Sequence, residues 1–167
     1  MKSRNGEIEE SLGNTDVFAR RSFLFFTPTT SIPDFYVGEG PLDVKLPIPT
    51  PDYTEIIESG FPESPKFWVN LIQRQTCKIR WKPIKNPKII YTRFDYHKIT
   101  RCDFAIGTKA VTDALKISSF GRRDGKLLYY FGAIFDDGPG DIELEWEQVI
   151  VGSPVEAGIR IEVKPTI

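Results

Sequence analysis

The chain has 167 residues, 40% hydrophobic and 13% aromatic, which is enough for one domain with an apolar core and too few for two ordinary domains. Its formal net charge of −1 excludes a global electrostatic attraction to nucleic acid or to an anionic membrane. No apolar run approaches the roughly 20 residues that cross a bilayer, and the polar N-terminus lacks the apolar centre of a signal peptide. We therefore expect no membrane span and no secretion signal.

The first third of the chain predicts an arm, two strands and a helix. Residues 1–16 are polar and acidic without a hydrophobic period, so we predict a flexible arm there and a single β-sandwich domain over 17–167. Strands are expected over the aromatic-rich segment 17–27 and the alternating segment 41–46. A helix is expected over 52–59, with Asp or Thr as its cap.

The middle of the chain predicts three strands and a second helix. Residues 67–82 are interpreted as one strand, preceded by a turn or short helix and alternating at its end, and 88–95 and 98–107 as two further strands. A short helix is expected over 108–115. Cys77 and Cys102 are interpreted as free thiols at strand positions, with a bridge between neighbouring strands as the alternative.

The most regular pattern of the chain lies in residues 141–151, where apolar and acidic residues alternate. This period of two is typical of a strand with one buried and one wet face. A buried strand is expected before it, over 126–135, and a final alternating strand after it, over 158–164. The whole list predicts an all-β protein, an antiparallel β-sandwich, with a jelly roll of about eight strands and one or two short helices as the best match.

A family resemblance rests mainly on the C-terminal segment GKLLYYFGAIFDDGPGDIELEWEQVIVG. It resembles the last two strands of the jelly-roll capsid proteins of small icosahedral positive-strand RNA viruses. The family pattern Gly-x-apolar-x-apolar-x-aromatic-x-x-apolar is matched here by Gly140, Ile142, Leu144, Trp146 and Val149. The segments FARRSFLFF and GPLDVKLP are similar to early strands of picorna-like capsid domains.

The resemblance implies a structural protein that self-assembles or decorates a shell, in the virion or the host cytoplasm. Its partners would be other copies or another capsid subunit, with RNA as a further partner. The acidic segment 1–16 departs from the arginine-rich arm of many such coat proteins, which puts RNA packaging by an arm in doubt. A viral accessory or movement protein is therefore an alternative.

A basic segment runs from Arg74 to Arg101 and contains one acid, Asp95. Six of its residues are candidates for an interface with nucleic acid or with another subunit: Lys78, Arg80, Lys82, Lys85, Lys88 and Arg93. Interleaved aromatic residues favour RNA, because bases stack on aromatic rings. Contact with an acidic face of another subunit and charge pairing within the monomer are the alternatives.

The candidate acidic face consists of Glu143, Glu145 and Glu147, which point to one side of the expected strand. In the jelly-roll arrangement that strand would lie beside residues 76–82. We therefore expect the acidic row to stand next to the basic row of Lys78, Arg80 and Lys82.

Catalytic patterns are missing from the sequence, and we predict that the protein is not an enzyme. His97 is the only histidine and lies in an expected tight turn. Three loop aspartates are candidate ligands for Ca²⁺, with a simple polar turn as the alternative: Asp136, Asp137 and Asp141. No other cofactor is expected.

The rival to a shell subunit is a monomeric ligand-binding β-sandwich that recognises carbohydrate or a host protein. Exposed Trp68, Tyr53 or Tyr36 would supply its stacking platform. Trp68 as a core residue is the alternative.

Overall fold

The computed structural model describes one compact unit within residues 33–167. The described residues are 33–52, 55–56, 58, 64–120, 127–129, 131–136, 138 and 140–167. The arm expected over 1–16 and the strand expected over 17–27 therefore lie outside the described residues.

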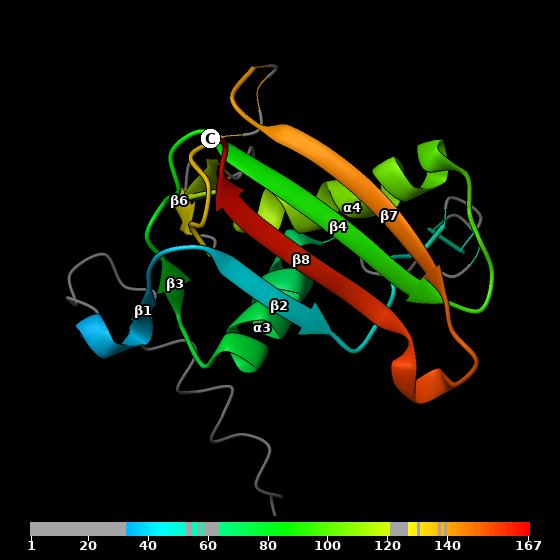
Figure 1. The fold of residues 1–167 in the computed structure, drawn as a ribbon. Helices are drawn as coiled ribbons and strands as arrows, with labels where there is room; N and C mark the ends of the chain where they lie inside the picture. The colour runs from blue at the N-terminus through cyan, green and yellow to red at the C-terminus, as the bar shows by residue number, and fades with distance from the viewer. Residues whose placement is uncertain are drawn as a thin grey trace, which may run out of the picture. The chain divides into compact units, whose positions relative to one another are not determined.

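A four-stranded sheet organises this unit, with the strand order β2-β8-β4-β7 (Figure 1). Its strands are β2 (Leu42–Leu46), β8 (Gly158–Pro165), β4 (Pro87–Asp95) and β7 (Glu143–Ile150). β8 pairs antiparallel with both β2 and β4, whereas β4 and β7 run parallel. Among the described residues, β2 and β7 are therefore the two edges of a mixed sheet.

Two helices, α3 (Pro65–Thr76) and α4 (Arg101–Leu115), pack on one face of this sheet (Figure 1). The alternation of each strand supplies the apolar side chains beneath them, as in β2, where residues are buried and exposed in strict turn. The core between the sheet and the helices includes Leu42, Leu46, Trp68, Ile72, Ile89, Tyr91, Phe104, Val111, Leu115, Ile159 and Ile161.

α3 replaces most of the strand expected over 67–82. α4 replaces most of the strand expected over 98–107 and includes the helix expected over 108–115, which is confirmed. α4 begins at Thr100, whose side chain accepts a hydrogen bond from the Asp103 backbone amide at 3.1 Å and donates one to the Asp103 carboxylate at 2.6 Å. This capping satisfies a backbone group that the first helical turn leaves unpaired, so the expected strand over 98–107 is wrong. α3 begins after Ser64 with a proline in its first turn and ends at Cys77 in the left-handed conformation.

The expected helix over 52–59 is confirmed where the structure describes it, because residues 55–56 and 58 are helical. The Glu55 amide donates to the Asp52 carboxylate at 2.8 Å, and the Asp52 amide donates back to the Glu55 carboxylate at 2.9 Å. This reciprocal pair is a capping box.

Two small two-stranded sheets and two short 3₁₀ helices complete the described elements. β1 (Val37–Gly38) runs parallel to β3 (Arg80–Trp81), and β5 (Ser118–Phe120) pairs antiparallel with β6 (Leu127–Tyr129). The 3₁₀ helices are η1 (Asp34–Tyr36) and η2 (Pro154–Glu156). A side chain at position 38 would overlap the Trp81 ring, so the β1–β3 pairing requires glycine there.

The loop between β4 and α4 is tied to the edge of the sheet by one side chain. The Gln148 amide nitrogen donates to the Ile99 carbonyl at 2.9 Å, and the Gln148 amide oxygen accepts from the Ile99 amide at 2.9 Å. The side chain thus makes the two hydrogen bonds that a neighbouring strand would make.

The prediction of a β-rich protein is confirmed, with mixed strand orientation. The antiparallel jelly roll of about eight strands is not confirmed, because β4 and β7 run parallel and helices cover the face on which a second sheet would pack. Cys77 and Cys102 are free thiols, as predicted, and both are exposed, but they lie at the end of α3 and in the first turn of α4, not on strands.

Candidate functional site

The face of the four-stranded sheet opposite the helices carries most of the charged candidates, and we call it the open face. Period-two alternation directs every second side chain of each strand to it. The open face comprises Asp43, Lys45, Lys88, Ile90, Thr92, Phe94, Glu143, Glu145, Glu147, Val149, Arg160, Glu162 and Lys164.

The acidic row of β7 is paired by Lys88 of β4. Lys88 lies directly opposite Glu143 in the register, and its Nζ is 2.9 Å from Glu143 Oε1 and 3.0 Å from Glu145 Oε2. The hydrogen bonds that Lys88 donates to Glu143, the larger effect, and to Glu145 raise the pKa of Lys88. Charge pairing within the monomer therefore exists, but the neighbour of the acidic row is β4 and not the expected segment 76–82.

Arg160 of β8 forms the second ion-pair centre of the open face. Its Nε and one Nη donate to the two Asp43 carboxylate oxygens at 2.8 and 2.6 Å, and it lies 2.9 Å from Glu162. The hydrogen bonds from Arg160 lower the pKa of Asp43, while partial burial opposes this change. Bidentate geometry of this kind is the strong form of an arginine–carboxylate contact.

We expect the Arg160→Gln substitution to raise the pKa of Asp43 toward its ordinary value. Because the folded-state pKa of Asp43 is lowered, this pair stabilises the fold above the unfolded-state pKa, and that contribution is lost as the pH falls through the lowered value. An NMR titration of the side-chain carboxyl carbon measures the pKa directly. Lys164→Gln, on the same face, is the control and should leave it unchanged; an unaltered Asp43 titration in Arg160→Gln would contradict the assignment.

The basic candidates do not form one surface. Lys78 donates to the Phe35 carbonyl at 2.8 Å, and Lys82 pairs with Glu39 at 2.6 Å, so both contact the segment around β1. Arg80, in β3, is exposed.

The other three basic candidates lie in or next to β4. Lys85 is exposed in the turn before the strand, and Lys88 lies on the open face. Arg93 is on the opposite face, with its side chain only 1% exposed. The six basic side chains therefore do not form one surface to which RNA could bind.

Arg93 is a buried structural cation, which corrects its assignment as an interface residue. It forms an ion pair with Asp95, its Nε donates to the Thr50 carbonyl at 3.2 Å, and its Nη1 donates to the His97 carbonyl at 3.0 Å. The guanidinium thus joins the end of β4 to two loops, and burial keeps it from any RNA phosphate.

The metal candidates are only partly described. Asp136 lies 3.7 Å from Lys116, and the Asp141 amide donates to the Gly138 carbonyl at 2.9 Å, as in a tight turn. Asp137 lies outside the described residues. Within the residues that the structure does describe, no group of three or more His, Cys, Asp or Glu side chains is placed to hold a metal ion.

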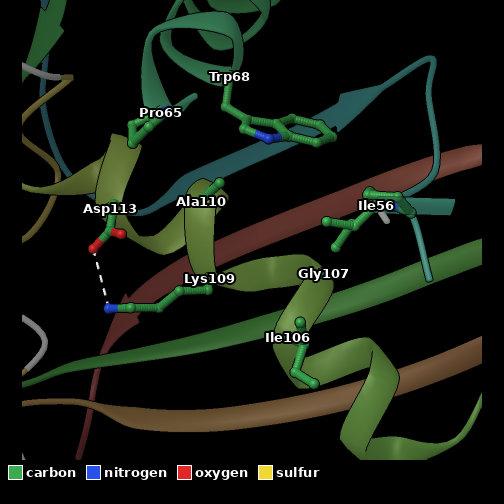
Figure 2. Close-up of a pocket in the computed structure, with 9 residues that line it drawn as sticks. Ile56, Pro65, Trp68, Ile106, Gly107, Lys109, Ala110 and Asp113 are labelled. Carbon is green, nitrogen blue, oxygen red and sulfur yellow. Dashed lines mark hydrogen bonds and ion pairs between the residues drawn. The ribbon is translucent and has the colours of Figure 1, made fainter. Parts of the chain in front are cut away.

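A pocket of 290 Å³ lies between α3, α4 and the segment after β2 (Figure 2). Trp68 of α3 lines one side of the pocket, and Ile56 lines another. Lys109 and Asp113 of α4 also line it, and they form an ion pair with a distance of 3.2 Å between Lys109 Nζ and Asp113 Oδ1. The lining consists of Pro51, Ile56, Pro65, Trp68, Ile106, Gly107, Lys109, Ala110 and Asp113. Its surface is mainly apolar, which suits a small apolar group.

Sequence reasoning missed this pocket because it placed residues 98–107 in a strand. A Cβ atom on Gly107 would lie 2.3 Å from the Pro51 carbonyl oxygen, so glycine allows α4 to approach that segment closely. The Thr100-x-x-Asp103 capping pattern was the sequence signal that would have revealed the helix.

Of the three aromatic candidates for a stacking platform, Trp68 is excluded by its burial. Trp68 is 1% exposed and belongs to the core, which was the alternative interpretation. Tyr36 is half-buried and packs on Phe35, with ring centroids 4.1 Å apart. Tyr53 lies outside the described residues.

Comparisons with protein-family models, curated proteins and solved structures found no match. Of the helices that the structure describes, none is long and apolar enough to cross a membrane.

Proposed function

We propose that the protein is a structural and interaction protein that acts by associating with further protein chains, foremost its own copies, without catalysis. The observation that carries this proposal is the sheet itself, which in the described part of the chain ends in two edge strands, β2 and β7, and is covered by helices on one face. Edge strands present unpaired backbone groups that are templates for another strand. A sheet with two such edges is suited to extension by a partner.

Exposed apolar side chains near the end of β7 support the same role. Val149 on the open face and Ile150 on the opposite face are 42% and 50% exposed, and Val155 in η2, the next element along the chain, is 92% exposed. Neighbouring exposed apolar side chains are a common feature of protein interaction sites.

A shell-forming or shell-decorating viral subunit with a jelly-roll fold is the specific form of this proposal. The sequence resemblance of the C-terminal segment supports it, whereas the parallel pairing of β4 and β7 departs from the antiparallel order of a jelly roll. RNA is a weaker candidate partner, because the basic residues are divided between separate surfaces and Arg93 is buried.

Size-exclusion chromatography with light scattering, at several protein and salt concentrations, tests the proposal. We expect species larger than the 19.0 kDa monomer at the higher concentrations. Absorbance at 260 and 280 nm across each peak reports bound nucleic acid. A monomer at every concentration would contradict self-association. A raised absorbance at 260 nm would support RNA as a partner.

A ligand-binding monomer is the second candidate, and the apolar pocket beside Trp68 favours it. At 290 Å³ the pocket lies near the lower end of the roughly 300–1,000 Å³ typical of small-molecule sites. A monodisperse monomer in size-exclusion chromatography with light scattering would favour this function over self-association.

A further inference from the structure

The charge pattern of the β2 edge is self-complementary. β2 directs Asp43 and Lys45 to the open face, on either side of Val44, whose side chain is buried on the helix side. In an antiparallel pair of identical strands centred on Val44, Asp43 of each copy lies directly opposite Lys45 of the other. The strand therefore presents an acid and a base at the spacing that its own copy requires.

We propose that a second copy of the chain pairs with β2 antiparallel about Val44, which joins the two four-stranded sheets into one continuous sheet across a two-fold axis. This inference rests on the proposed self-association and specifies its surface. On the open face the register joins Asp43 to the second copy's Lys45 twice, once on each side of the axis. On the helix side the same register places Leu42 opposite the second copy's Leu46.

The neighbouring strand β8 gives the strongest support. Inside one copy, Lys45 lies directly opposite Arg160, and Asp43 lies directly opposite Glu162. Like charges directly opposite each other across strands are unfavourable, and within the copy they are relieved by the contacts of Arg160 with Asp43 and Glu162 and by those of Lys45 with the Phe94 ring and the Glu156 carbonyl. The added strand would give each of the two β2 charges an opposite charge on the side away from β8, where no strand of the described residues pairs with β2.

The pattern continues beyond the two β2 strands. In the joined sheet, the basic row of Lys45 and Arg160 in one copy runs into the acidic row of Asp43 and Glu162 in the other. The basic row of each copy is thus continued by the acidic row of the other copy. Four charged side chains from each copy therefore favour the same register. A slip by one residue would place side chains of opposite faces against each other and is excluded by the buried side of the sheet.

The other edge of the sheet does not offer this complementarity. A symmetric pair of β7 strands would bring the acidic row of Glu143, Glu145 and Glu147 against its own copy. Such a contact is repulsive, as expected for an edge that is protected against self-pairing. Pairing of β2 with β7 of another copy would be head-to-tail and would produce open chains instead of a closed dimer.

Three charge variants test the register: Asp43→Lys, Lys45→Asp, and the double exchange D43K/K45D. Each single variant puts like charges opposite each other on both sides of the two-fold axis, and the double variant restores opposite charges. We expect each single variant to raise the dimer dissociation constant at least about tenfold, and the double variant to bring it back toward the wild-type value. Sedimentation equilibrium of the full chain over a range of concentrations measures these constants.

Two controls separate the interface from effects within one copy. Lys164→Glu, on the same face but two strand positions beyond Glu162, should leave the dissociation constant unchanged. Urea unfolding of each variant shows whether the fold persists, which matters because Asp43→Lys loses the contact with Arg160 and Lys45→Asp loses contacts with Phe94 and the Glu156 carbonyl. The double variant loses all of these contacts, so recovery of the dimer in it cannot come from them.

The outcomes distinguish this inference from the function on which it rests. If the wild-type chain associates and neither single variant weakens the association, the β2 surface is wrong while self-association stands. If both single variants weaken it and the double variant does not recover, the antiparallel register about Val44 is wrong. A wild-type monomer at every concentration would overturn both proposals.

Discussion

Replacing Arg93 with alanine is expected to lower the free energy of unfolding by about 3–5 kcal/mol. The substitution leaves the Asp95 carboxylate, whose side chain is only 12% exposed, without its cation. It also removes the hydrogen bonds to the Thr50 and His97 carbonyls, and uncompensated buried polar groups carry most of such a cost. Urea denaturation at neutral pH measures the change.

A second variant separates the buried charge from the lost packing. Arg93→Met combined with Asp95→Asn removes both charges and keeps an unbranched side chain of similar length, so it should cost clearly less than Arg93→Ala. Lys88→Ala is the surface control on the same strand, and its effect should stay within about 1 kcal/mol. An Arg93→Ala protein as stable as the Lys88→Ala protein would show that the ion pair is not buried as described.

The Trp68→Ala substitution is expected to cost about 3–5 kcal/mol, and Trp146→Ala clearly less. Trp68 is 1% exposed between α3 and the rest of the core. Trp146 is only half-buried: its indole nitrogen donates to Thr108 at 3.1 Å, and the Arg101 guanidinium lies 5.4 Å from its ring centroid. Its replacement therefore loses less buried area. Urea titrations of both variants test this order, and a larger loss for Trp146 would contradict the burial of Trp68.

Alternating sequence patterns predicted the strands of the main sheet well. The segments 41–46, 88–95, 141–151 and 158–164 correspond to β2, β4, β7 and β8, within one or two residues at each end. Their period of two reports a sheet with one face in the core, which is a local property of each segment. The parallel pairing of β4 and β7 depends on how distant segments of the chain come together, so no local pattern predicts it.

The helix predicted over 108–115 is the second half of α4, whereas the first half of α4 and most of α3 were missed although both have local helix signals. In 98–107 the isoleucine and phenylalanine favoured a strand, although Thr100 and Asp103 form a cap and the apolar residues then continue at helical spacing. In 67–82 the alternation of the last six residues was extended backward over a helix. Ser64 and Pro65 marked its true start.

The inclusion of Arg93 in the candidate interface is an error that the sequence itself could have revealed. On one strand, residues 88 and 93 differ by an odd number and must face opposite sides, so Lys88 on the wet face implies Arg93 in the core. The ion-pair partner of the acidic row cannot be deduced from spacing along one strand, because it depends on which strands are neighbours in the sheet. That order came from an assumed jelly roll, and the observed sheet places β4 there.

The contact between Gln148 and Ile99 also sets how the loop before α4 moves. Loops with free backbone groups open on their own, independently of the sheets that they connect. Here the Ile99 backbone is held by a side chain that β7 itself positions. Opening of this loop therefore requires either a rotamer change in Gln148 or separation of the β7 end, so the motion of the loop is coupled to the conformation of one side chain at the sheet edge.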